Sequence, residues 1–380
     1  MFIEKSIRGG ISQVSNRYSE ANNKYMPSYD SSKPSKYVVY LDVNNLYGWA
    51  MSQCLPYAKF EWVDTNIDVL SIPDDGDTGY ILQVDLEYPE HLHYLHKDFP
   101  FCCEHQVPPG SNFKKLMTTL HNKTEYTLHY RNLKQALNAE LKLTKIHKVL
   151  KFQQSAWLKP YIDLNTKLRT AATTAFEKDL YKLANNAIFG KTMENIRKHR
   201  IAKLVSKDVI QTNLSKFDTS DYAEGNPYNM PQDNKKVLGL MKDEANGRII
   251  THFVGLRSKM YSFKLQYTNE ERQTVWQKYK NTMDDAAIEK IVNNLGVTKK
   301  SKGVKYSVVK NAITFEDYVE CLKEFTTKSV TQSTFRSYAH NMFTIMQEKI
   351  ALSPYDDKRC LQKDSYDTLP WGHYATTMIE

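Results

Sequence analysis

Hydrophobic and polar positions change their spacing several times along this chain of 380 residues. Crowded β-branched and aromatic residues predict strands, whereas apolar residues three and four positions apart predict helices. A polar stretch over 15–36 precedes the first predicted strand. The predicted strands are "KYVVYLD" (36–42), "GYILQVDLEY" (79–88), "GRIITHFVGL" (247–256) and "SKMYSFKLQY" (258–267). The predicted helices fall within 113–205, for example "NLKQALNAELKLTKIHKVL" (132–150), and in the tail at 269–296 and 335–352.

This order of elements predicts an α+β protein of two or three lobes. A sheet domain is interrupted by a helical lobe and is followed by a second, mostly helical lobe. No internal repeat or low-complexity block interrupts it.

Composition places the chain among intracellular globular proteins. It is 41% hydrophobic, yet no apolar run approaches the roughly 20 residues that span a bilayer, and "MFIEKSIRGG" lacks the apolar segment of a signal peptide. Five cysteines form no regular framework, which favours reduced thiols. We expect a location inside the cell or a virion, with nucleus and mitochondrion both open.

Positive charge is concentrated in the middle of the chain. Residues 111–207 hold 20 Lys and Arg against 6 Asp and Glu, a net charge of +14, whereas the whole chain carries +9. Such a segment concentrates polyanions, and counterion release on phosphate contact is the usual source of their affinity. A solvated basic face without a partner is the simpler alternative.

Two local patterns could carry chemistry. In "YVVYLDVNNLYGWAM", Asp42 ends an apolar strand and Tyr47 follows across a turn, so Asp42 is either a Mg²⁺ ligand held by rigid backbone or an ordinary turn residue. In "YKLANNAIFGKTMEN", a lysine, an asparagine, a phenylalanine and a glycine share one helix face. That face could meet a nucleotide, or it could belong to an amphipathic core helix, and Arg169 is expected on a partner helix. The four positions are Lys182, Asn186, Phe189 and Gly190.

Four motifs in order resemble family B DNA polymerases. "DVNNLYGWAM" is similar to motif A (D-x-x-S-L-Y-P), and "KLANNAIFG" is similar to motif B (K-x-x-x-N-S-x-Y-G). "IRGG" (7–10) resembles the Y-x-G-G element that joins exonuclease and polymerase parts, and "KMY" (259–261) resembles the K-x-Y element that holds the primer end. The residues of these motifs most resemble those of the protein-primed branch, which is found in Polinton/Maverick-type transposons, linear plasmids and viruses.

The resemblance implies a right-hand polymerase with an antiparallel palm sheet, helical fingers and a mostly helical thumb, without the exonuclease domain. It divides the chain into an N-terminal linker (1–36), the first part of the palm with motif A (37–110), a basic insertion facing terminal protein or template (111–150), fingers with motif B (151–207), the rest of the palm (208–265) and the thumb (266–380).

The resemblance also assigns roles. Asp42 would be the catalytic carboxylate that binds the Mg²⁺ ions, and Tyr47 would stack under the deoxyribose. The fingers would bind the deoxynucleoside triphosphate through Arg169, Lys182, Asn186, Phe189 and Gly190, and primer and template DNA would contact Arg8, Gly9, Gly10, Lys259 and Tyr261. The implied reaction is template-directed nucleotide addition to a primer hydroxyl, supplied first by a terminal priming protein.

One expected motif is absent. The family's second carboxylate motif, motif C, is an apolar strand ending in Asp-Thr-Asp-Ser. The only similar segment of this sequence is "KFDTSDYAEGNPYNM", which contains Asp218 and Asp221. No apolar strand precedes it and its acidic spacing differs, so we expect impaired catalysis and a doubtful second metal site. The alternative is a non-catalytic nucleic-acid-binding remnant of a mobile-element or viral polymerase.

Two further groups are weaker candidates. Asp85 and Glu87 share a strand face and could pair with Asp42, although alternating acids are common on half-buried strands. The stretch "HLHYLHKDFPFCCEH" (91–105) is rich in His and Cys, but its spacing fits no standard zinc finger.

Overall fold

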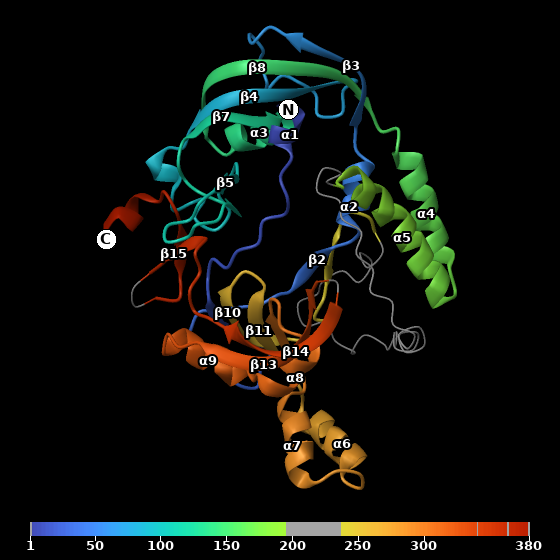
Figure 1. Ribbon diagram of the computed structural model, residues 1–380, viewed down its shortest axis with the longest axis vertical. Helices are drawn as coiled ribbons and strands as arrows, with labels where there is room; N and C mark the ends of the chain where they lie inside the picture. Colours follow the sequence, from blue (N-terminus) through green and yellow to red (C-terminus); the bar gives the residue numbers. More distant parts are fainter. Residues whose placement is uncertain (1, 195–236, 340, 363–364, 379–380) are drawn as a thin grey trace. The chain divides into compact units, whose positions relative to one another are not determined.

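The computed structural model describes residues 2–194, 237–339, 341–362 and 365–378, and Figure 1 shows the order of their elements. The chain divides into two compact units, each assembled from separate stretches of sequence. The first unit takes residues 1–39, 82–147 and 248–380, and the second takes 40–81 and 148–247.

A four-stranded sheet organises the C-terminal part of the first unit, in the order β1-β10-β11-β12. All three pairings are antiparallel, and β10 and β11 form a hairpin from Ile250↔Leu265 to Arg257↔Met260. The two strand predictions for this region are therefore confirmed. The strand bounds are β1 (Tyr18–Glu20), β10 (Ile250–Arg257), β11 (Met260–Leu265) and β12 (Val297–Ser301).

Two helices lie between β11 and β12 in the first unit, and two more follow β12. The predicted helical stretch 269–296 forms α6 (Asn269–Tyr279) and α7 (Asp285–Asn293), begun by the side chains of Thr268 and Asp284. After β12 come α8 (Tyr306–Ala312) and α9 (Phe315–Lys323). A capping box begins α9, with Thr314 accepting from the Asp317 amide while the Asp317 carboxylate accepts from the Thr314 amide.

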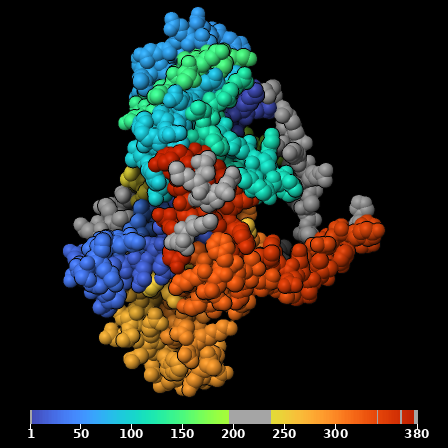
Figure 2. Space-filling view, turned by 90° about the vertical axis from the view of Figure 1, so that its left-hand side faces the viewer, coloured from blue at the N-terminus to red at the C-terminus, as the bar shows by residue number. Residues whose placement is uncertain are grey.

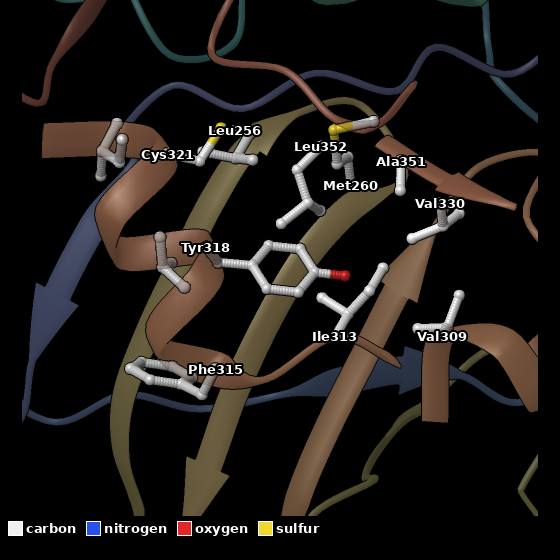
Figure 3. Packing of buried hydrophobic residues seen from close by; sticks show 12 residues of the cluster. Leu256, Met260, Val309, Ile313, Phe315, Tyr318, Cys321, Val330, Ala351 and Leu352 are labelled. Atoms are coloured by element: carbon white, nitrogen blue, oxygen red, sulfur yellow. The ribbon is translucent and has the colours of Figure 1, made fainter. Parts of the chain in front are cut away.

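One hydrophobic cluster of this unit lies between α9 and the sheet. Tyr318 points from α9 across β10 and β11, and its ring is fully buried among aliphatic side chains (Figure 3). Its hydroxyl donates a hydrogen bond of 2.8 Å to the carbonyl of Lys300 on β12. The cluster comprises Val254, Leu256, Met260, Val309, Ile313, Phe315, Tyr318, Cys321, Leu322, Val330, Ala351 and Leu352.

The helix predicted for 335–352 is wrong. This segment belongs to a long hairpin of β13 (Lys328–Tyr338) and β14 (Asn341–Leu352), paired from Lys328↔Leu352 to Tyr338↔Asn341. Short apolar runs fit the spacing of a helix as well as that of a strand. Pairing with β13 makes this segment a strand. The described part of residues 266–380 therefore combines helices with strands, so the expectation that this segment is mostly helical is wrong. Figure 2 shows the hairpin standing away from the neighbouring helices.

Long-range pairing also overrides the helix predicted for 132–150. Only its first part is helical, as α3 (Tyr130–Asn138), and after a left-handed residue at Glu140 the chain forms β8 (Lys142–Ser155). β8 lies between β3 (Leu55–Val63) and β4 in a sheet of order β3-β8-β4-β7. The strand predicted at 79–88 is confirmed as β4 (Thr78–Glu87), and β7 spans Lys123–His129.

The remaining elements of the first unit are short. They are α1 (Phe2–Ser6), η1 (Glu90–Leu92), β5 (Glu104–Gln106), β6 (Lys115–Met117), β15 (Arg359–Leu361), β16 (Thr368–Pro370) and η4 (Tyr374–Met378). The C-terminal segment is tied to the N-terminal one: the amide of Thr368 donates to the carbonyl of Ser15, and Arg17 donates through its guanidinium to the carbonyl of Pro354. Arg359 is 1% exposed and donates to Thr368 and to the carbonyl of Lys97.

The described residues of the second unit form a short ribbon, a strand pair and three helices. β2 (Leu41–Val43) pairs with β9 (Met241–Asp243), so the strand predicted at 36–42 is confirmed only at its end. β3 (Leu55–Val63) pairs with β8 from Leu55↔Ser155 to Val63↔Val149. The helices are α2 (Leu46–Met51), α4 (Lys159–Ala171) and α5 (Ala175–Thr192).

Candidate functional site

The turn after Asp42 positions Tyr47 in the first turn of α2. Asn45 adopts a left-handed backbone with φ of 43°, and its side chain accepts a hydrogen bond from the amide of Gly48. A Cβ at position 48 would lie 2.4 Å from the Asn45 side chain. Asn45 and Gly48 therefore depend on each other, and this explains why both depart together from the serine and proline of the motif A pattern.

The helix α5 is the motif B helix that the sequence predicts. It begins with a capping box in which Thr174 and Glu177 satisfy each other's amides, a pattern visible in the sequence. It packs on α4, where the Tyr161 hydroxyl donates to the carbonyl of Ala184. Only Asn185 among its eighteen residues is buried, so most of this helix faces outward.

The residues of motif B differ in exposure. Lys182 and Gly190 are exposed, while Asn186 and Phe189 are half-buried. A Cβ on Gly190 would find no described heavy atom within 4 Å, so chain packing does not require glycine there. Arg169 is exposed in the last turn of α4, and within the described part of the chain no ion pair holds either Arg169 or Lys182.

Aromatic stacking joins the two motifs. The rings of Tyr47 and Phe189 lie 4.1 Å apart between centroids and are inclined by 12°. This is a stacked pair between α2 and α5, and Tyr47 remains 49% exposed. Two segments more than a hundred residues apart in sequence thus form one surface within the second unit.

Asp42 lies on the β2–β9 ribbon directly opposite Lys242. Its Oδ2 atom is 3.4 Å from the Lys242 ammonium, which also pairs with Glu244. Partial burial opposes the charged form, but the hydrogen bonds and charges of Glu244 and Asp42 outweigh it and raise the pKa of Lys242. Sequence reasoning missed Lys242 and Glu244, because no local signal reveals which residues pair with β2.

The donor set that the described residues offer at Asp42 does not fit a two-ion metal site. Among the described residues, no group of three or more His, Cys, Asp and Glu side chains could hold a metal ion. The carboxylates of Asp42 and Glu244 both pair with the ammonium group of Lys242. Asp218 and Asp221, the motif C candidates of the sequence, lie outside the described residues.

The expected DNA-contacting residues lie in the first unit and differ in exposure and in their contacts with the rest of the chain. Lys259 is exposed in the β10–β11 turn with φ of 61°, and the Tyr261 ring stacks with Phe253 at 6.1 Å and with Phe263 at 6.5 Å. The guanidinium of Arg8 donates to the carbonyl of Thr127 at 2.8 Å, and its Cζ atom lies 3.9 Å from the ring centroid of Tyr126. Contacts within the first unit therefore hold Arg8 in place.

Gly9 and Gly10 follow Arg8 and are exposed, and a Cβ on either would meet no described atom within 4 Å. Nothing in the packing of the described chain accounts for two glycines at these positions.

The weaker candidates have structural partners. Asp85 accepts from the amide of Glu125 and contacts His147, and these two contacts together with the charge of Lys145 keep the pKa of Asp85 below its usual value. Glu87 pairs with Lys142.

In the His- and Cys-rich stretch, burial lowers the pKa of His93 and of His96 and raises that of Cys102 to about 12. The Tyr88 hydroxyl is 2.9 Å from Nδ1 of His96. These groups are parts of a packed interior.

The described residues combine helices with antiparallel strand pairs, and motif A and motif B share one surface in the second unit. A profile of the family described as DNA polymerase type B, organellar and viral, matches residues 1–281. The chain belongs to this family, which confirms the family resemblance of its motifs.

Solved structures agree on the fold. The chain is similar to Phi29 DNA polymerase in an orthorhombic crystal form (TM-score 0.52, 14% identity, 92% of this chain and 62% of that chain). It is similar to the ternary complex of Phi29 DNA polymerase with primer-template DNA and incoming nucleotide substrates (TM-score 0.51, 14% identity, the same coverage). This chain therefore spans about 62% of the length of the polymerase that it matches. A search of curated protein sequences finds no match.

No helix in the described ranges combines the length and the apolar character that a membrane crossing requires.

Proposed function

We propose that this chain is the polymerase part of a protein-primed DNA-directed DNA polymerase and that its nucleotide site lies on α2 and α5. The stacking of Tyr47 on Phe189 carries the proposal, because it joins motif A and motif B in a chain of this family. In this assignment α4 and α5 belong to the fingers, the strands around Asp42 and Lys259 to the palm, and residues 266–380 to the thumb.

Each side chain of the site has a role that its exposure supports. Lys182 and Arg169 are exposed cations, suited to the triphosphate of an incoming deoxynucleotide. Tyr47 offers its ring to the deoxyribose, where it opposes a 2′-hydroxyl. Phe189 offers a ring face to the nascent base pair and Gly190 allows close approach, with Asn186 beside them.

Primer and template DNA are the proposed partners of the first-unit residues. Lys259 is placed to neutralise a phosphate near the primer end, and Tyr261 lies beside it on β11. Gly9 and Gly10 leave room for a template strand. Arg8 would support them through its contacts with Thr127 and Tyr126. Phi29 DNA polymerase has been solved with primer-template DNA and with single-stranded DNA, which supports this choice of partner. A terminal priming protein at 111–150 belongs to the same proposal.

The reaction is a phosphoryl transfer. The primer hydroxyl oxygen forms a bond to the α-phosphorus of the deoxynucleotide, the bond from this phosphorus to the α,β-bridging oxygen breaks, pyrophosphate leaves and the hydroxyl proton passes to solvent. Divalent cations stabilise the charge of such a transfer in this family. Asp42 is the proposed Mg²⁺ ligand, and the described residues complete no second ion site. We therefore expect slow incorporation.

A second candidate function is nucleic-acid binding without catalysis. It is favoured by the pairing of Asp42 with Lys242, which leaves no described cluster of metal-binding side chains. In this case the basic segment 111–207 would bind DNA through phosphate contacts, and the affinity would fall steeply with salt.

Primer extension with Mg²⁺ tests the proposal. We expect incorporation by the wild-type chain and its loss in Asp42→Ala. The matched control is Asp64→Ala, because Asp64 is likewise an exposed aspartate next to a strand residue, directly after β3. Salt-sensitive DNA binding without any incorporation would favour the binding remnant. Equal incorporation by wild type and Asp42→Ala would refute the assignment of the site.

A further inference from the structure

The β2–β9 ribbon places three charged side chains on one face. Asp42 is directly opposite Lys242, and Glu244 follows two residues later. Cross-strand partners and residues two apart along a strand project to the same side. The amide of Glu244 donates to the carbonyl of Tyr40 at 2.9 Å, so the antiparallel pairing continues to Glu244. Asp42, Lys242 and Glu244 therefore lie together by register.

The three side chains make a bridged arrangement. The Lys242 ammonium contacts both carboxylates, Asp42 at 3.4 Å and Glu244 in a closer ion pair. The side chain of Lys242 is 33% exposed and that of Glu244 is 32% exposed, whereas that of Asp42 is 57% exposed. The ammonium is thus held mainly by Glu244, and Asp42 keeps one side toward solvent. Two carboxylates share one monovalent cation.

We propose that the Lys242 ammonium is a built-in cation of the Asp42–Glu244 pair and that it competes with divalent cations for Asp42. This inference rests on the proposed function, in which Asp42 is the metal ligand. A divalent ion that approaches Asp42 meets a positive charge 3.4 Å from its Oδ2 atom, and repulsion between the two cations weakens binding. Tight binding requires the lysine to withdraw toward Glu244 or solvent.

Divalent-ion binding by the full chain, without DNA or nucleotide, tests the inference. Mn²⁺ alone is the probe, and its bound fraction is read by electron paramagnetic resonance. Lys242→Met should increase the Mn²⁺ affinity about tenfold, because a repelling charge beside the carboxylate is removed. Lys242→Arg keeps the charge and should bind Mn²⁺ as the wild type does. Lys242→Gln provides a second neutral variant in case Lys242→Met fails to fold.

The matched control is Lys151→Met. Lys151 is also a strand lysine that pairs with a carboxylate on the neighbouring strand: its Nζ atom is 3.0 Å from Oε1 of Glu61. Lys151 belongs to the β3–β8 pair and not to the β2–β9 ribbon, so its removal should leave the Mn²⁺ affinity unchanged. The double variant Lys242→Met with Asp42→Asn should lose the gain, since the gain is assigned to Asp42.

Three outcomes would overturn the inference: unchanged affinity in both neutral variants, an equal gain in Lys151→Met, or a gain that survives Asp42→Asn. The readout separates this inference from the proposed function. A chain that shows the predicted Mn²⁺ behaviour but extends no primer refutes the polymerase activity alone. A chain that extends primers with Lys242-independent Mn²⁺ binding refutes only the competition.

Discussion

The Tyr318 cluster of the first unit and the helix α5 of the second unit differ in how far their side chains are buried. The first unit buries a hydrophobic cluster around Tyr318 and also encloses Arg17 and Arg359, which are 3% and 1% exposed. In the second unit, α5 buries only Asn185, while Asp42, Tyr47 and Lys182 are exposed. Packing explains the buried residues of the first unit. It gives no structural reason for the exposed Lys182 of the second unit, which is the pattern expected of a residue selected for binding.

Removing the Tyr318 ring should have the largest effect on stability. Tyr318→Ala deletes a fully buried aromatic side chain and its hydrogen bond to Lys300, so we expect a loss of about 3–5 kcal/mol in the free energy of unfolding. Urea denaturation, with hydrogen exchange of α9 as a local readout, measures it. Tyr318→Phe keeps the ring and should cost about 1 kcal/mol.

The contrast with the second unit is Leu183→Ala on α5. Leu183 is 63% exposed, so its truncation should change the free energy of unfolding by no more than about 0.5 kcal/mol. A large loss in Leu183→Ala, or a small one in Tyr318→Ala, would break the distinction between the two units.

Acid should weaken the first unit through two buried histidines. His93 and His373 are 4% and 0% exposed, with ring centroids 5.4 Å apart, and burial lowers the pKa of each. Their folded-state pKa values lie below the unfolded value of about 6.5. Their contribution to stability is therefore complete above that value and is lost as the pH falls through it toward the lowered pKa.

Burial lowers the pKa of both histidines, and the charges around them oppose this shift at His93 but add to it at His373. Glu90 favours the charged form of His93, whereas His93, Lys97 and Arg359 disfavour the charged form of His373. Urea denaturation between pH 8 and pH 5 should show stability decreasing by at most about 1.4 kcal/mol per pH unit for each imidazole. His373→Asn keeps an acceptor for the amide of Ala375 but does not titrate. An undiminished pH dependence in this variant would contradict the assignment to His373.

Local signals in the sequence were sufficient for the motif B helix and its surroundings. The capping box of Thr174 and Glu177, and the helical spacing that follows, predict α5 without any tertiary information. The alternation and β-branching of "GYILQVDLEY" likewise predict β4. In these segments, local preference and long-range packing favour the same structure.

Segments whose partners are distant in sequence could not be predicted. The apolar spacing of 142–150 and of 341–352 suits a helix as well as a strand, and pairing with β3 and with β13 decides the outcome. The pairing of Asp42 with Lys242 joins residues two hundred positions apart, so no window of sequence reveals the cation beside the candidate carboxylate. The stack of Tyr47 on Phe189 depends on tertiary packing in the same way.

The most direct test of the account is the affinity for a deoxynucleoside triphosphate. It is measured at equilibrium on the full chain with primer-template DNA whose primer ends in a dideoxynucleotide, so that no incorporation occurs. Lys182→Ala should weaken binding about tenfold or more, because a charge-assisted contact to phosphate is worth about 1.5–3 kcal/mol. Lys167→Ala, an exposed lysine on α4, should leave the affinity unchanged. Equal affinity of wild type and Lys182→Ala would contradict a nucleotide site on α2 and α5.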